Sequence, residues 1–287
     1  MDGIVGFGEK WREIADLASY KHEYFFKYLQ ISPSYQLAHR KVALKEKIAK
    51  TDLPKDFDLV LDTYKKAGDV FSVNFIEWWV RGGNKLFARE KGRKRLIISF
   101  DSAKSKKDLM QEFEALIDKA KLIEKDEKKE AIKFLVNKVR FDSLRLRHNL
   151  IEAKADFYFN KKKEEHWKLA KFVGLTTKWT KTLRLNSKKT SLNLEARNYL
   201  GVLVSKNIKE GLHLSENAAR GVFPSIAKID SALSFDHGFI KEQANRNTSR
   251  AMKLMLEHKN DKDFIKYVDP SNSLKRTRKI DESTMLH

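Results

Sequence analysis

Apolar residues recur at helical spacing along most of the chain. Two clear stripes lie near the N-terminus, one at Tyr24, Phe25, Tyr28 and Leu29, and one at Phe71, Phe75, Trp78 and Trp79. Both are typical of helices that bury one aromatic face in a core. A platform on which nucleic-acid bases stack is the alternative interpretation of these aromatic residues.

Few residues interrupt this helical pattern. The chain has only 12 Gly and 4 Pro, which favours helices over a sheet with many turns. Ser32-Pro33-Ser34 and Asp52-Leu53-Pro54 predict helix boundaries, because proline is tolerated in a first helical turn but not inside a helix. Asp236-His237-Gly238 predicts a turn before a helix that begins near Phe239.

A long helical pattern runs from residue 124 to residue 159. It contains no Gly or Pro, and its apolar residues keep approximate helical spacing at Ile132, Leu135, Val139, Leu146, Leu150 and Phe157. We expect a long or once-broken helix here.

One segment has the pattern of a strand instead. Residues 96–100 form a short apolar run of the length of a buried strand, followed by Asp101-Ser102, a good helix N-cap pair, and a helical stripe at Leu109, Phe113, Leu116 and Ile117. The alternating segment 208–214 is a candidate partner strand. The sequence therefore predicts a mainly α, multi-helix protein with at most a small β element near residues 96–100 and 208–214.

These patterns divide the chain into four parts. We expect an aromatic-rich helical region over residues 1–95, a strand with long helices over 96–160, a basic helical region over 161–268, and a flexible basic tail over 269–287.

The charge of the chain narrows its functional class. Lys and Arg number 59 against 39 Asp and Glu, a net charge of +20. Such an excess opposes compaction and suits a polyanionic partner, although a need for solubility also explains it.

The chain has no cysteine, which excludes disulfides and thiolate metal sites and suggests a reducing, cytoplasmic location. Neither a signal peptide nor a membrane-spanning run is evident, so we expect no membrane association.

Residues 166–184 resemble a bacterial helix-turn-helix. Ala170 occupies the small position at the helix crossing, Gly174 the turn four residues later, and Leu169, Val173, Leu175 and Leu183 the buried inner faces. The resemblance implies that Thr176 or Thr177 caps a recognition helix. Thr180 departs from the pattern, because a β-branched aliphatic residue usually packs there, and the bulky Trp179 stands beside it. An ordinary αα-hairpin is the alternative.

Basic residues gather in three clusters. Ten Lys or Arg against two Glu lie between Lys161 and Thr190, a local balance of +8. Here the candidate DNA contacts are Thr177, Lys178, Lys181, Arg184, Lys188 and Lys189. The second cluster provides Arg81, Lys85, Arg89, Arg93, Lys94 and Arg95, in a glycine-containing segment that either wraps a phosphate backbone or is an exposed connection. The third provides Lys275, Arg276, Arg278 and Lys279 in the tail.

No pattern predicts catalysis, a cofactor or a metal site. Asp101 at a strand end is explained by N-capping, and the second cluster does not match a P-loop. His148, beside Arg145 and Arg147, shares the residue types of the tyrosine recombinase phosphate clamp, but the second spaced Arg and the nucleophilic Tyr are not recognisable.

We therefore expect a non-enzymatic nucleic-acid-binding protein, a DNA-binding regulator or a replication or maintenance factor of a bacterial or mobile-element type. The alternative is a structural or assembly protein, a scaffold or adaptor that docks its basic helical surface onto an acidic protein partner. RNA binding by the N-terminal aromatic residues is a third hypothesis. The sequence leaves a homo-oligomer open.

Overall fold

The computed structural model describes residues 18–90, 105, 107–116, 132–135, 140–160, 165–175, 177–184, 188–257 and 259–260. Within these ranges, the side chains of residues 88–90, 133, 134, 159, 177, 180 and 182 fall outside the description. The chain forms two compact units, one of residues 1–84 with 133–287 and one of residues 85–132. In the second unit the structure describes a helix over residues 107–116.

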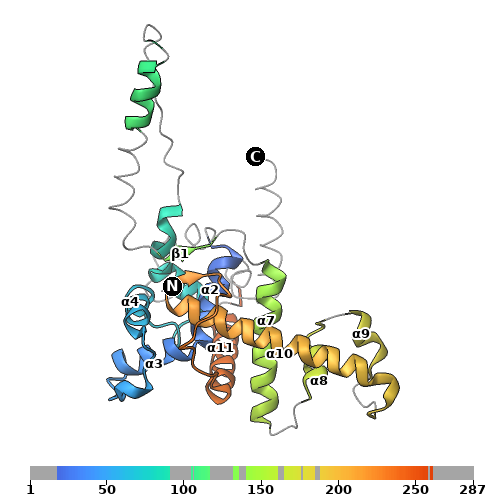
Figure 1. Ribbon diagram of the computed structural model, residues 1–287. Helices are drawn as coiled ribbons and strands as arrows, with labels where there is room; N and C mark the ends of the chain where they lie inside the picture. The colour runs from blue at the N-terminus through green and yellow to red at the C-terminus, as the bar shows by residue number, and fades with distance from the viewer. Residues whose placement is uncertain are drawn as a thin grey trace. The chain divides into compact units, whose positions relative to one another are not determined.

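The protein is mainly α-helical, as the sequence predicts (Figure 1). None of the described helices is both long enough and apolar enough to cross a bilayer. In chain order the elements are α2 (Tyr20–Ile31), α3 (Pro33–Val42), η1 (Lys50–Asp52), α4 (Phe57–Ala67), α5 (Phe75–Arg81), η2 (Gly83–Glu90), β1 (Lys133–Phe134), α7 (Phe141–Phe159), α8 (His166–Phe172), α9 (Thr177–Thr182), α10 (Ser191–Ala219), β2 (Val222–Phe223) and α11 (His237–Glu257).

The β element differs from the prediction. β1 pairs in parallel with β2, with Lys133 opposite Val222 and Phe134 opposite Phe223. The predicted strand over 96–100 and Asp101 after it lie outside the described residues. The partner strand predicted over 208–214 is wrong, because these residues lie inside α10.

Gly211 explains the misinterpreted segment. In a strand its lack of a side chain would suggest an edge or a bend, but in α10 it allows α7 to approach closely. A Cβ atom at position 211 would lie only 2.6 Å from Ile151 Cδ1 on α7. Figure 1 shows α10 crossing α7. The glycine is therefore a helix-crossing residue.

The helix predicted over 124–159 is confirmed only in its C-terminal part, as α7. Residues 132–135 are extended, and the Leu135 amide donates a 2.6 Å hydrogen bond to the Phe223 carbonyl. Ile132 and Leu135 fit the helical spacing by chance. A strand of two residues is too short to show the alternating pattern by which the sequence would reveal it.

The first aromatic stripe is core, as predicted. Tyr24, Phe25, Tyr28 and Leu29 on α2 are all buried. The second stripe is not one helix face, because Phe71 precedes α5, whose N-cap Asn74 accepts a 2.9 Å hydrogen bond from the Glu77 amide. Trp78 and Trp79 are only 4% and 2% exposed. Both tryptophans are therefore packing residues, and their burial argues against base stacking by these two side chains.

The predicted helix boundaries are confirmed. Ser32 separates α2 from α3 and its Oγ accepts a 3.2 Å hydrogen bond from the Tyr35 amide, with Pro33 at the first helical position. η1 ends at Asp52, and Leu53 and Pro54 lie between it and α4. Asp236 accepts a 2.9 Å hydrogen bond from the Phe239 amide, and α11 begins at His237, two residues before the predicted start.

Candidate nucleic-acid interface

The turn between α8 and α9 has the geometry that the sequence predicts. Gly174 has a φ of 67°, in the left-handed region that favours glycine. The Leu175 amide donates to the Ala170 carbonyl at 2.8 Å, and the Gly174 amide donates to the Lys171 carbonyl at 3.2 Å. Together these two hydrogen bonds form a Schellman motif, which ends α8 and reverses the chain.

Apolar side chains hold this helix pair against α7 and α10. Ala170, Leu169 and Leu183 are buried in one cluster with residues of both long helices, and Val173 and Leu175 pack at its edge. Every position that the sequence assigns to the inner faces is therefore at least partly buried. The arrangement is what amphipathic helix pairing requires.

Polar contacts fix the start of α8 on α10. Trp167 Nε1 donates a 2.6 Å hydrogen bond to the Glu165 carboxylate, which also pairs with Lys168 at 2.6 Å and with Arg197 of α10 at 3.4 Å. The Arg197 guanidinium lies 4.5 Å from the centre of the Trp167 ring. The hydrogen bond from Lys168, together with that from Trp167, lowers the pKa of the Glu165 carboxyl.

Two contacts fix α9. The Lys171 ammonium donates to the Leu183 carbonyl, one of the carbonyls left unpaired at the end of α9. The Trp179 ring lies 5.6 Å from the Tyr199 ring of α10 and packs at the edge of the apolar cluster. α9 is only six residues long, which is about 9 Å. The side chain of Thr180 and the predicted cap Thr176 lie outside the description.

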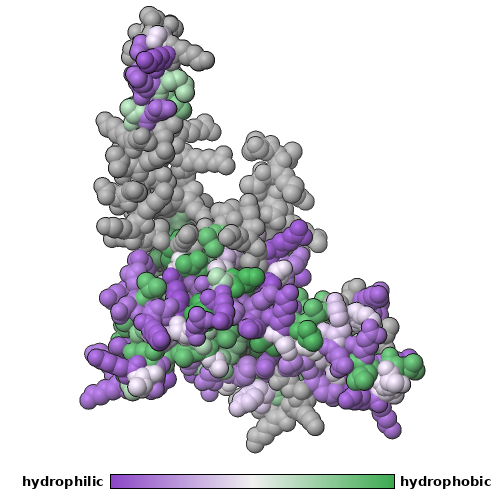
Figure 2. Space-filling model, in the orientation of Figure 1, coloured by the Kyte–Doolittle hydropathy of each residue, from purple (hydrophilic) through white to green (hydrophobic). Residues whose placement is uncertain are grey.

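Five of the candidate DNA contacts in the first basic cluster are exposed to solvent. Lys178, Lys181 and Arg184 are exposed on α9 and just beyond it, and Lys188 and Lys189 are exposed before α10. Lys178 and Lys181 are three residues apart and so lie on the same side of α9. The side chain of Thr177 lies outside the description. Figure 2 shows a mainly hydrophilic surface around α9 and the first turns of α10, with hydrophobic patches between.

The other two clusters are described only in part. Arg81 is exposed at the end of α5 and pairs with Glu77 at 2.6 Å, and Lys85 is exposed in η2. The side chain of Arg89 lies outside the description, as do the whole residues Arg93, Lys94, Arg95, Lys275, Arg276, Arg278 and Lys279. Among the described residues, only the first cluster therefore provides more than two exposed cations.

The candidate recombinase residues do not converge. Arg145 contacts Asp142 at 3.2 Å, while Arg147 Nε donates to Glu210 of α10 at 2.9 Å. His148 is buried, with Nδ1 3.4 Å from Glu152. Each of these three side chains therefore has a structural role, as a contact within the fold. No group of three or more His, Asp or Glu suited to a metal occurs in the part of the chain that the structure describes.

A cavity of about 810 Å³ lies beside these residues, between α2, α5, α7 and α11. Its charged walls are internally paired, with Lys27 to Glu23 at 2.7 Å and Lys241 to Asp156 at 2.5 Å. Burial works to raise the pKa of the Glu152 carboxyl on this wall, but His148 and the neighbouring lysines outweigh it and lower that pKa. A carboxylate held in its charged form by cations is poorly suited to act as a general acid.

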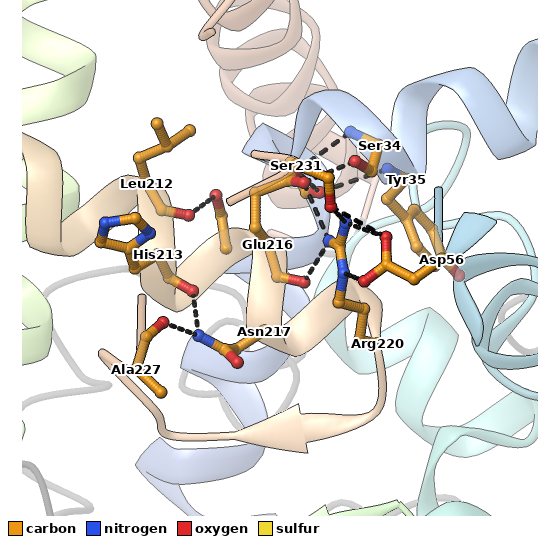
Figure 3. A network of polar contacts seen from close by, with 12 residues as sticks. Ser34, Tyr35, Asp56, Leu212, His213, Glu216, Asn217, Arg220, Ala227 and Ser231 are labelled. Atoms are coloured by element: carbon orange, nitrogen blue, oxygen red, sulfur yellow. Dashed lines mark hydrogen bonds and ion pairs between the residues drawn. The ribbon is translucent and has the colours of Figure 1, made fainter. Parts of the chain in front are cut away.

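The most buried charged group among the described residues was not predicted. Glu216 of α10 is fully buried and accepts hydrogen bonds from Ser32 Oγ at 2.8 Å and from the Ser34 amide at 3.0 Å, at the start of α3. It pairs with Arg220 at 2.9 Å, and Arg220 pairs with Asp56 at 2.6 Å (Figure 3). This network joins α3 and α4 to α10. Its one sequence signal is a Glu and an Arg four residues apart around Ala218 and Ala219.

Comparisons with known proteins give no match, so the functional assignment rests on the geometry of the site. No protein-family model matches the chain, and neither a curated protein nor a solved structure does.

Proposed function

We propose that this chain is a non-enzymatic nucleic-acid-binding protein that contacts duplex DNA through α9 and its flanking lysines. The observation that carries the proposal is the α8–α9 unit itself. Its glycine turn and apolar inner faces are anchored on two long helices, while Lys178, Lys181 and Arg184 face solvent.

Such a unit combines the two parts of DNA recognition. Exposed Lys and Arg neutralise phosphates and release counterions, which provides affinity without reading the sequence. A helix held rigidly by its inner face can present side chains to base edges in the major groove. The proposed class is a regulator or a replication or maintenance factor that acts with nucleic acid in the cytoplasm of a bacterium or on a mobile element.

One observation favours a competing function. α9 spans only about 9 Å, and Trp179 on it is directed to the apolar cluster and Tyr199 rather than to solvent. Fewer side chains can therefore reach base edges than on a longer helix. A scaffold or adaptor that docks the same cations onto an acidic protein surface needs no such reach.

The two functions differ in what the protein binds. For the first, fluorescence anisotropy with a labelled random duplex should show an association constant whose logarithm falls linearly with the logarithm of salt concentration. The absorbance ratio of protein purified without nuclease should also reveal bound nucleic acid. If neither duplex nor RNA binds even at low salt, the proposal is overturned, and co-purification with a protein assembly would support the scaffold.

A further inference from the structure

One side of α10 carries an exposed stripe that flanks the contact between Tyr199 and Trp179. Its members follow one another at alternating spacings of three and four residues, and we name them the outer α10 face: Leu192, Glu195, Tyr199, Val202, Lys206 and Lys209. Leu192 is 96% exposed, Val202 69% and Tyr199 45%. By contrast, Ala196, Leu200 and Val204 of the same helix are buried.

This spacing is that of a helix that packs along a second helix. Alternating three and four residue steps keep one seam of a helix directed at its partner over several turns. The outer α10 face runs for 17 residue steps, about 26 Å. Burial of Leu192, Tyr199 and Val202 against a partner would remove apolar surface from water, which is favourable.

The charges on the face select the partner. We propose that the partner is a second copy of this chain, with its α10 antiparallel about a two-fold axis between Leu200 and Gly201. In this register Tyr199 meets Val202 of the second copy, and Glu195 meets Lys206. Leu192 lies along the aliphatic stem of Lys209.

The same charges exclude the parallel arrangement. Parallel helices would place Glu195 opposite Glu195 and Lys206 opposite Lys206, and like charges at an interface are repulsive. The antiparallel register instead forms two equivalent Glu–Lys pairs on either side of the Tyr199 and Val202 contacts. A two-fold interface uses the same patch on both copies, and this face is complementary to itself in that way.

The dimer should be weak and reversible. The face is narrow compared with the roughly 800 Å² per partner of a standard interface. Two chains of net charge +20 also repel each other, and salt screens this repulsion. The proposal does not rest on nucleic-acid binding.

Charge reversal tests the register. The full chain, freed of nucleic acid by nuclease, is studied by sedimentation equilibrium over a range of protein concentrations at about 0.3 M salt, where repulsion is screened. Wild type should associate to a dimer. Glu195→Lys and Lys206→Glu should each raise the dimer dissociation constant about tenfold or more, and the double variant should restore it, because it re-forms both pairs with the charges exchanged.

Matched reversals on α11 provide the control. Glu257→Lys and Lys253→Glu change an exposed pair of the same type, and they should leave the dissociation constant unchanged. Circular dichroism confirms that each variant is folded. A wild-type chain that is monomeric at every soluble concentration overturns the proposal. So does a dimer that the single reversals leave intact or that the double variant fails to restore.

Discussion

The Leu175 amide donates to the Ala170 carbonyl across 2.8 Å, over the left-handed turn at Gly174. This hydrogen bond ends α8 and directs the chain into α9. It depends on a backbone conformation that costs a residue with a Cβ atom roughly 1 to 2 kcal/mol. The direction in which the chain enters α9 thus depends on one glycine.

Gly174→Ala should lower the free energy of unfolding by about 1 kcal/mol, because Ala is strained at a φ of 67°. Urea denaturation measures the change. Gly201→Ala is the control, since Gly201 lies inside α10 and an alanine Cβ there would meet nothing within 4 Å. It should raise stability by up to about 1 kcal/mol, because Ala favours helix more than Gly. Equal effects of the two changes would contradict this account of the turn.

The α7–α10 crossing makes a second prediction. Gly211→Ala should destabilise the protein by up to about 2 kcal/mol, because the new Cβ would lie 2.6 Å from the buried Ile151 Cδ1 and this clash should outweigh the gain in helix propensity. Ile151→Val removes that Cδ1 atom and alone should cost about 1 kcal/mol. A double-mutant cycle by urea denaturation should show that Gly211→Ala costs less once Ile151 has been replaced by valine. Strictly additive effects would mean that the helices do not meet at these residues.

These two glycines show what sequence reasoning can predict. The Gly174 turn was predictable because a local pattern of small, apolar and glycine residues specifies it within a few residues. The role of Gly211 was not, because the close approach that requires it comes from Ile151, sixty residues away. The pairing of β1 with β2 was missed for the same reason, since two-residue strands are specified by a distant partner. The network of Glu216, Arg220 and Asp56 likewise joins segments that share no local signal.

Loss of one buried charge should reveal the strength of that network. Arg220→Met leaves the fully buried Glu216 carboxylate without its cation, so unfolding should become easier by about 3 to 5 kcal/mol. Arg246→Met is the matched control, because the pair between Arg246 and Glu242 is exposed on α11. It should change stability by less than about 0.5 kcal/mol. Chemical denaturation measures the free energy of unfolding of both variants. An effect at Arg220 as small as that at Arg246 would refute the structural role of the network.

Acid should weaken the same network through Asp56. The hydrogen bond from Arg220 lowers the pKa of the Asp56 carboxyl, so the folded protein binds a proton there less readily than the unfolded chain. Its contribution is therefore present above the unfolded Asp pKa of about 3.9 and is lost as pH falls through the lower folded value. Thermal unfolding at pH 6 and pH 3 should show a smaller loss in Asp56→Asn than in wild type. An identical loss would contradict this assignment.

Contact between α9 and DNA is tested most directly by comparing specific with random affinity. Lys181→Ala with Arg184→Ala should weaken binding to a preferred duplex, found by selection from random sequences, more than binding to random duplex. The control, Arg246→Ala with Lys253→Ala, removes the same charge from exposed sites on α11. We predict that the first pair reduces the ratio of specific to random affinity and that the control leaves this ratio unchanged. Equal losses in the two double variants would contradict DNA recognition by α9.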